Sequence, residues 1–157
     1  MTDPGPFIPS TPGSYVLVLA ATQATTIRVG RLHEMAVTPG WYLYVGSALG
    51  AGGLAGRLRH HVRPVARPHW HVDYLRAVTA LTAVWWLASP ERLEHCWALA
   101  LAQLSGSSIP MARFGASDCR CPAHLLYLPA LPAAVALCDL LSPSPSARPT
   151  LSPSTGA

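Results

Sequence analysis

Residues 41–76 constrain the fold most, because they encode a strand, a glycine-rich turn and two helices in direct succession. The segment 41–46 is short and apolar and contains several aromatic side chains, which is typical of a strand. Gly50, Gly52 and Gly53 then break that pattern. From position 57 to position 76, five arginines and four histidines stand against one aspartate. Such a concentration of planar cations and imidazoles suits contact with phosphodiesters better than it suits a core.

Four further segments have the pattern of strands. Residues 13–20 are apolar and rich in β-branched side chains, which predicts a buried strand. Residues 26–32 alternate apolar and polar side chains, which predicts its hairpin partner with one face in water. Residues 81–88 are dense in large apolar side chains, and residues 124–128 form a final short strand.

The first predicted helix opens at the glycine pair and has two distinct stripes. Leu54, Leu58 and Val62 form an apolar stripe that is expected to face the core. Arg57 and His61 are four residues apart, so they share a second stripe on the same helix.

Two more helices are predicted farther along the chain. Residues 69–78 form the second, and the third opens at Ser89, with serine as the cap and a proline in the first helical position. Glu94 is expected at the edge of the buried face of the third helix. That face is made of Leu93, Trp97, Ala100 and Leu104.

With 157 residues, the chain is long enough for one domain with a real core. We expect a flexible lead over residues 1–12, a domain over 13–141 and a disordered proline- and serine-rich tail over 142–157. All eleven basic residues are arginine, and the net charge of +4 points weakly to an anionic partner. Four cysteines, no secretory signal and no apolar run of membrane-spanning length predict a cytoplasmic protein that does not enter a membrane.

Five motifs in one order resemble a known family. Residues 13–15 (GSY) and 44–46 (YVG) look like the two halves of the GIY-YIG nuclease signature. VGRL, YVGSALG, GGLAGRLRHH, HWHVDYL and FGASDCRCPAHL together closely resemble a branch of small stand-alone domains in that superfamily called DUF123. The resemblance covers roughly residues 13–128. It implies an α+β fold, with a small, mainly antiparallel sheet flanked by about three helices. It also implies metal-dependent, endonuclease-like hydrolysis of DNA phosphodiester bonds in repair or processing.

The resemblance further implies a role for each matching residue. Tyr15, Tyr44, Arg57 and His61 would be catalytic, and Glu94 would bind Mg²⁺ or another divalent cation. These roles are chemically reasonable, because the guanidinium of Arg57 offers a fixed planar fork to the non-bridging oxygens of a phosphate. A carboxylate is also the kind of hard ligand that Mg²⁺ prefers.

Two choices stay open among these residues. Either Tyr15 or His61 could be the base that activates water, since a phenol with a pKa of about 10 needs positive charge nearby to ionise. Glu91 competes with Glu94 as the metal ligand, but the helix dipole alone accounts for an acid in the first turn of the predicted helix.

The residues around these candidates form two further groups. Arg59, His60, Arg63, His69 and His71 are candidates for DNA contact, and one of the adjacent histidines at positions 60 and 61 is expected to face solvent. The other group is a possible loop site with metal-ligand residue types, which His95 or Cys96 could complete. It consists of Asp118, Cys119, Cys121 and His124. A single residue separates the two cysteines, whereas zinc sites usually have two to four, so zinc is not expected there.

The chain departs from the family pattern in one respect. It contains no asparagine, although GIY-YIG nucleases commonly carry one after the metal-binding helix. Ser117, Asp118 or His124 could take that role, or the role is absent. Two alternatives therefore stand beside the nuclease: a catalytically weak nucleic-acid-binding module with the same fold, and a zinc-stabilised interaction domain.

Overall fold

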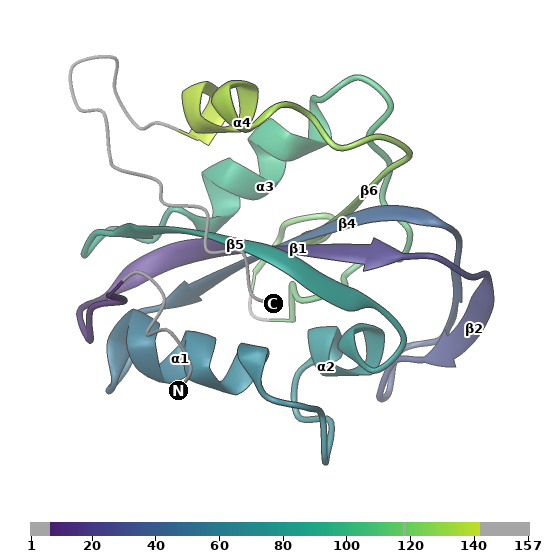
Figure 1. Cartoon of the computed structure of the whole chain (residues 1–157), viewed down its shortest axis with the longest axis horizontal. Coiled ribbons are helices and arrows are strands. Elements are labelled where there is room, and N and C mark those ends of the chain that lie inside the picture. Colours follow the sequence, from purple (N-terminus) through teal and green to yellow (C-terminus); the bar gives the residue numbers. More distant parts are fainter. Residues whose placement is uncertain (1–6, 118, 142–157) are drawn as a thin grey trace.

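The computed structural model describes residues 7–117 and 119–141, which form six strands and four helices (Figure 1). In chain order the elements are β1 (Gly13–Ala21), β2 (Thr25–Arg28), β3 (Glu34–Val37), β4 (Gly40–Ala48), α1 (Gly53–Val62), α2 (His71–Arg76), β5 (Ala80–Ala88), α3 (Glu94–Ala102), β6 (Leu125–Leu128) and α4 (Ala134–Leu141). The predicted α+β class is therefore confirmed. The predicted disordered tail lies outside the described residues. None of the helices described is long and apolar enough to cross a membrane.

The central sheet has four antiparallel strands in the order β5-β1-β4-β6. Figure 1 shows α1 and α2 over one face of this sheet and α3 and α4 over the other. Side chains alternate along a strand, so β1 sends Tyr15, Leu17 and Leu19 to the α1–α2 side. Val16 and Val18 point to the α3–α4 side. Both faces are buried, which explains why β1 is apolar along nearly its whole length.

The segment 26–32 does not pair with β1, contrary to the sequence prediction. Its strand, β2, ends at Arg28 and pairs with β3, which has no counterpart in the prediction, in a separate two-stranded sheet. Both edges of β1 are already occupied, by β4 on one side and by β5 on the other. Gly30, with a φ of 51°, allows the chain to turn toward β3 at this point.

In α1, His61 takes the buried position that the hydrophobic pattern assigns to Val62. Leu54 and Leu58 are buried as predicted, but Val62 is 57% exposed and His61 only 1% exposed. The Tyr15 hydroxyl explains this difference, because it gives the buried imidazole a hydrogen-bond partner.

The third helix, α3, starts later than the sequence predicts. The Ser89 hydroxyl accepts a hydrogen bond from the Glu91 amide, in a turn that precedes the helix. The first turn of α3 begins with Glu94 instead, and its side chain is on the buried face as expected. The fourth helix, α4, has no counterpart in the prediction, because the prolines ahead of it interrupt the apolar run there.

Part of the predicted flexible lead is bonded to the domain. The carbonyls of Pro9 and Thr11 accept hydrogen bonds from the amides of Ala55 and Leu54, each at 3.0 Å. These amides lie in the first turn of α1, where a helix leaves its donors without intrahelical partners. The segment 9–12 therefore helps to fix the start of the helix that carries Arg57.

Candidate active site

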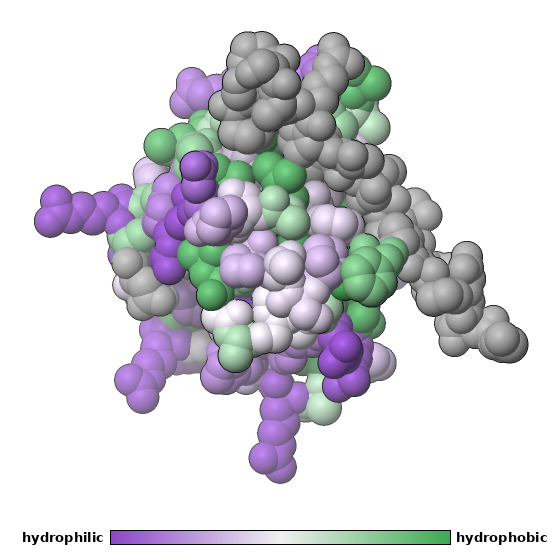
Figure 2. All heavy atoms as spheres, turned by 90° about the vertical axis from the view of Figure 1, so that its left-hand side faces the viewer, coloured by the Kyte–Doolittle hydropathy of each residue, from purple (hydrophilic) through white to green (hydrophobic). Residues whose placement is uncertain are grey.

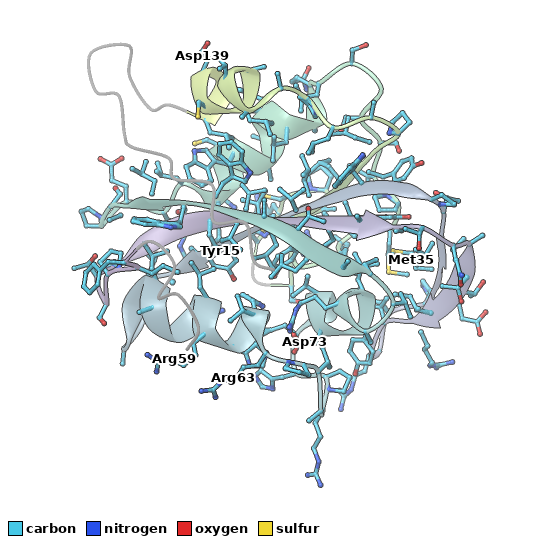
Figure 3. The ribbon with its side chains drawn as sticks, viewed as in Figure 1. Tyr15, Met35, Arg59, Arg63, Asp73 and Asp139 are labelled. Atoms are coloured by element: carbon cyan, nitrogen blue, oxygen red, sulfur yellow. The ribbon has the colours of Figure 1, made fainter. Side chains whose placement is uncertain are left out.

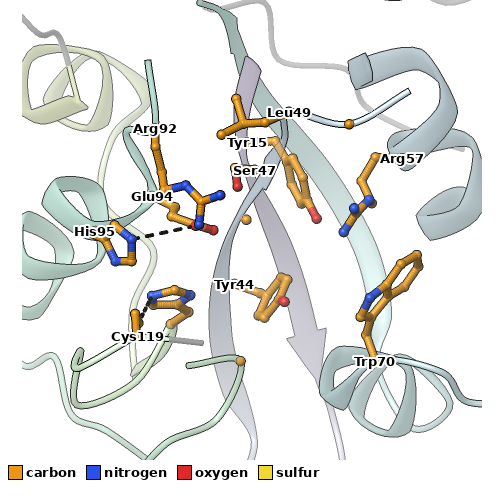
Figure 4. A pocket seen from close by; sticks show the side chains of 14 residues that line it. Tyr15, Tyr44, Ser47, Leu49, Arg57, Trp70, Arg92, Glu94, His95 and Cys119 are labelled. Atoms are coloured by element: carbon orange, nitrogen blue, oxygen red, sulfur yellow. Dashed lines mark hydrogen bonds and ion pairs between the residues drawn. The ribbon is translucent and has the colours of Figure 1, made fainter. Parts of the chain in front are cut away.

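A pocket of about 300 Å³ opens where β1 begins and β4 ends, between α1 and the start of α3 (Figure 4). It is lined by Tyr15, Tyr44, Gly46, Ser47, Leu49, Gly50, Arg57, Trp70, Arg92, Glu94, His95, Gly115, Cys119 and His124. Tyr15, Tyr44, Arg57 and Glu94, which the sequence analysis selects from four separate elements, thus line one pocket. Figure 4 shows Arg57 and Glu94 on opposite sides of it, with the two tyrosines between them.

The two tyrosines belong to neighbouring strands and leave the sheet on the same face. Tyr15 of β1 lies opposite Gly46 of β4, and Tyr44 is two residues from that glycine. A Cβ atom at Gly46 would collide with the Tyr15 hydroxyl. The glycine after Tyr44-Val45 is therefore required to leave room for the Tyr15 side chain. Burial, reinforced by the charge of Glu94, raises the pKa of Tyr44 above its ordinary value.

Tyr15 is hydrogen bonded to His61 of α1, with 2.8 Å between the hydroxyl oxygen and Nε2. Burial is the main reason that the pKa of Tyr15 lies well above its ordinary value, although the Arg57 guanidinium opposes that shift. Burial, together with the nearby Arg76 and His60, lowers the pKa of His61 to about 3. At neutral pH the two groups are therefore a neutral phenol and a neutral imidazole. The two candidate bases form one hydrogen-bonded pair.

The cationic side of the pocket rests on an indole ring. Cζ of Arg57 lies 4.5 Å from the centre of the Trp70 ring, in a cation–π contact. Such stacking restrains the guanidinium while its N–H groups stay available to a ligand. Trp70 is itself held by an edge-on contact with the His60 ring, with 4.4 Å between the ring centres.

Asp73 holds the connection between α1 and α2 together from inside (Figure 3). Its carboxylate accepts hydrogen bonds from the amides of His69 and Trp70, at 2.8 and 3.0 Å. It also lies 3.2 Å from Nε2 of His60 and from Nη1 of Arg76. Burial alone would raise the pKa of Asp73, but these donors outweigh it and hold the pKa below its ordinary value. Because donors occupy both carboxylate oxygens, Asp73 is a structural anchor for the Trp70 side of the pocket.

The acidic side of the pocket begins with Glu94, which is 9% exposed. Its Oε1 lies 3.2 Å from Nη1 of Arg92 and 3.8 Å from Nε2 of His95. No hydrogen bond or ion pair within the described residues uses Oε2. A carboxylate with one oxygen free to face a pocket is suited to binding a divalent cation.

A second set of metal-ligand side chains adjoins this acidic side. Ligand atoms of His95, Cys119, Cys121 and His124 all lie within 4.8 Å of one another. Asp118, which the sequence analysis includes in this loop site, lies outside the described residues. Burial lowers the pKa of His124. Burial and hydrogen bonding to Cys119 raise the pKa of the Cys121 thiol to about 11.

The predicted DNA-binding residues fall into two groups. Arg59, Arg63 and His69 are exposed, and Figure 3 shows Arg59 and Arg63 projecting from the α1 side of the molecule, away from the sheet. Figure 2 shows strongly hydrophilic side chains extending from this same half of the molecule. His60 and His71 instead have partners in the fold. His60 contacts the buried carboxylate described above, and Nδ1 of His71 accepts a hydrogen bond from a loop amide at 2.9 Å.

The sequence matches the family model "Domain of unknown function DUF123" over residues 14–142, which is most of the chain. This chain belongs to the DUF123 family. No curated protein and no solved structure matches it significantly. The DUF123 match includes every residue that lines the pocket, so the pocket lies entirely within the matched domain.

Five residues that line the DUF123 pocket are not selected from the sequence. They are Ser47, Leu49, Trp70, Arg92 and Gly115. Trp70 stands in a strongly basic stretch between two histidines, and an aromatic ring in such a place was an available signal for a stacked cation. In the sequence, Arg92 is indistinguishable from an ordinary residue at a helix start. Its ion pair with Glu94 depends on the turn that precedes α3. Ser47 carries no signal that distinguishes it from any other serine in a strand.

Proposed function

We propose that this DUF123 domain is a GIY-YIG-type endonuclease that uses a divalent cation to hydrolyse phosphodiester bonds in DNA. The observation that best supports the proposal is that Tyr15, Tyr44, Arg57 and Glu94 line one pocket. An anionic ester resists attack by water, so its hydrolysis requires positive charge at the phosphate and a group that accepts a proton. The guanidinium, a cation on the carboxylate and the phenols provide these functions.

Arg57 and Glu94 would hold the reacting phosphate from opposite sides (Figure 4). Arg57, stacked on Trp70, would clamp two non-bridging oxygens with its planar fork. A Mg²⁺ ion at Glu94 would polarise the phosphate and assist the leaving oxygen. Oε2 of Glu94 is the oxygen that fits this ion best, because Oε1 already faces Arg92 and His95.

Tyr15 and His61 would act as a proton relay. The Tyr15 hydroxyl would accept a proton from the attacking water and pass its own proton to Nε2 of His61, which is 2.8 Å away. A phenol with a raised pKa can serve in this relay, because the phenolate does not have to persist. The negative charge of bound DNA would also raise the pKa of His61 from about 3 and make it a better acceptor. Tyr44 would orient the water or the phosphate.

The exposed arginines of α1 would hold the DNA backbone next to the pocket. Arg59 and Arg63 are exposed on the helix that also carries Arg57. Contacts of this kind neutralise phosphates and fix the position of a duplex, but they carry no base sequence. We therefore expect the domain to select DNA by its structure more than by its sequence.

A second candidate function is a nucleic-acid-binding module that retains the fold without strong catalysis. The observation in its favour is the absence of asparagine from the whole sequence. Of Ser117 and His124, the two described candidates for the role of the family asparagine, His124 lines the pocket and Ser117 does not.

A cleavage assay separates the two functions. The full chain is incubated with labelled duplex, nicked, flapped and branched DNA in Mg²⁺, Ca²⁺ or EDTA, and both binding and products are measured. The endonuclease predicts Mg²⁺-dependent products from at least one of these structures, and loss of cleavage in Arg57→Ala. Arg67→Ala, an exposed arginine of the same stretch, is the control. Binding to the DNAs without product in any condition would favour the binding module.

A further inference from the structure

Four side chains of metal-ligand type lie close together beside the pocket, although one of them is distant from the other three in the sequence. His95 belongs to the first turn of α3, whereas Cys119, Cys121 and His124 precede β6. Nδ1 of His95 lies 2.9 Å from Sγ of Cys121, and Nε2 of His124 lies 3.4 Å from Sγ of Cys119. All four ligand atoms lie within 4.8 Å of one another. The ligands of a tetrahedral zinc ion, with bonds of about 2.0 to 2.3 Å, are about 3.3 to 3.8 Å apart.

We propose that His95, Cys119, Cys121 and His124 bind one structural zinc ion in a tetrahedral Cys2His2 site. Two thiolates and two imidazoles are the donors that zinc takes, whereas Mg²⁺ takes oxygen. Four protein ligands complete the tetrahedral shell, so the ion is structural and leaves no position for substrate. The Cys121 amide also lies 3.4 Å from Sγ of Cys119, and a backbone donor at sulfur stabilises a thiolate.

The short spacing of the two cysteines does not exclude zinc in this fold. The single residue between Cys119 and Cys121 argues against zinc only if the loop must supply all the ligands. The fold instead brings His95 from α3 to the loop, 26 residues away from Cys121. A helix and a loop then share the ion, which is a different arrangement from two closely spaced ligand pairs.

The zinc ion would also position Glu94, and this role, unlike zinc binding itself, rests on the proposed function. With Nδ1 of His95 bound to the ion, Nε2 carries a proton and lies 3.8 Å from Oε1 of Glu94 (Figure 4). On the other side, the carbonyl of His124 accepts a hydrogen bond from the Val45 amide at 2.9 Å. The ion would therefore tie the first turn of α3 to the strand that carries Tyr44.

Metal analysis of the full chain, produced without a histidine tag in zinc-containing medium, tests this proposal. We expect one zinc ion per chain in the wild-type protein, and a large loss of zinc in Cys119→Ala and Cys121→Ala. Cys96→Ser is the matched control, because Cys96 lies next to His95 in α3 but is outside the cluster and exposed. It should keep its zinc. A wild-type protein that holds far less than one zinc ion, even after refolding with added zinc, would overturn the proposal.

A second variant keeps the test decisive if the cysteine variants do not fold. His95→Cys retains four ligands but changes the set to three thiolates and one imidazole. Its zinc content should stay at one per chain. The cobalt-substituted protein should gain thiolate-to-metal absorption relative to wild type while keeping the visible bands of tetrahedral cobalt. An unchanged cobalt spectrum in His95→Cys would contradict the assignment of His95. Neither measurement uses DNA cleavage, so zinc binding and the endonuclease can fail separately.

Discussion

The two faces of the central sheet are both covered by helices and both bury an apolar cluster, but the α1–α2 face also buries a hydrogen-bonded phenol and imidazole. On the α3–α4 face, Val16, Val18 and Leu101 pack in an apolar cluster. On the α1–α2 face, the buried residues include Tyr15 and His61, and these two are hydrogen bonded to each other. One strand, β1, contributes to both faces through its alternating side chains.

Under the proposed function, stability and chemistry would be separated within one small domain. An apolar face gains its free energy from the area removed from water and tolerates no polar group without a partner. The other face holds a phenol, an imidazole and a carboxylate in the interior by pairing each of them with a donor or an acceptor. Changes to the buried polar groups of the α1–α2 face should therefore reduce cleavage more than stability, and changes in the apolar cluster of the α3–α4 face should do the reverse.

Tyr15→Phe should give the largest effect on the α1–α2 face. The change removes the hydroxyl that would link the attacking water to His61 in the proposed relay, and loss of such a group lowers a rate by about 10³-fold. The unpaired imidazole should cost only about 1 to 2 kcal/mol of stability. Single-turnover cleavage and urea unfolding measure both. Tyr42→Phe is the control, since the Tyr42 hydroxyl is hydrogen bonded to Thr38 and Tyr42 does not line the pocket. Equal rate losses in the two variants would contradict a specific role of the Tyr15 hydroxyl in cleavage.

Leu101→Ala should give the opposite result on the α3–α4 face. Leu101 is fully buried, so truncation should lower the free energy of unfolding by about 3 kcal/mol through lost burial and a cavity. The cleavage rate per folded molecule should not change. Leu99→Ala, on the same helix but 53% exposed, should cost less than about 0.5 kcal/mol. A large rate loss in folded Leu101→Ala would mean that the two faces are coupled.

The pH dependence of stability tests whether the buried His61 on the α1–α2 face is neutral in the folded protein. Burial lowers the pKa of His61 to about 3, whereas an unfolded histidine has a pKa of about 6.5. The unfolded state therefore binds more protons between these values, and stability falls as the pH is lowered from about 6.5 toward 3. Through His61 alone, the protein should lose about 2 kcal/mol between pH 6.5 and pH 5.

Urea unfolding of His61→Gln at pH 6.5 and pH 5 tests this prediction. The variant should lose about 2 kcal/mol less than the wild type over that interval. His69→Gln, which removes an exposed imidazole, is the control. The same pH dependence in wild type and His61→Gln would show that this imidazole does not stay neutral in the folded protein.

Arg59→Gln should give the smallest effect, because it would remove one proposed contact between an exposed arginine and a phosphate. The slope of log affinity against log salt should become shallower by about 0.9, and the affinity for DNA should fall a few-fold. Fluorescence titrations over a range of salt concentrations measure both. Arg28→Gln, on β2 and away from the pocket, should leave the slope unchanged. Equal slopes for wild type and Arg59→Gln would remove α1 from the DNA-binding surface.

The sequence predicts the strands of the central sheet well, because alternation and apolar content leave little choice for β1, β4 and β5. The sequence prediction is wrong where a residue or strand from another part of the chain determines which side chain is buried or which strands pair. Hydrophobicity places Val62 in the core, but the Tyr15 hydroxyl makes His61 the buried residue. The pairing of β2 with β3 depends on both edges of β1 being occupied, which no local pattern reveals.

In the candidate site, too, local motifs are informative, whereas contacts between distant segments could not be predicted. The motifs identify Tyr15, Tyr44, Arg57 and Glu94 through a family resemblance, and these four do line one pocket. The residue types allow either His95 or Cys96 to complete the loop site, and only the packing of α3 against the rest of the domain shows that His95 lies next to it. The motifs thus select residues that line one pocket, but they do not predict which residues from distant segments meet.

The decisive measurement for the endonuclease proposal is the single-turnover rate of DNA cleavage by Glu94→Gln, measured beside its affinity for the same DNA. The substitution keeps the shape of the side chain but removes the charge that would hold Mg²⁺. We predict a rate loss of about 10³-fold or more with nearly unchanged DNA affinity, while the exposed Glu91→Gln behaves as wild type. Full Mg²⁺-dependent cleavage by Glu94→Gln would contradict the proposal that Glu94 holds the divalent cation.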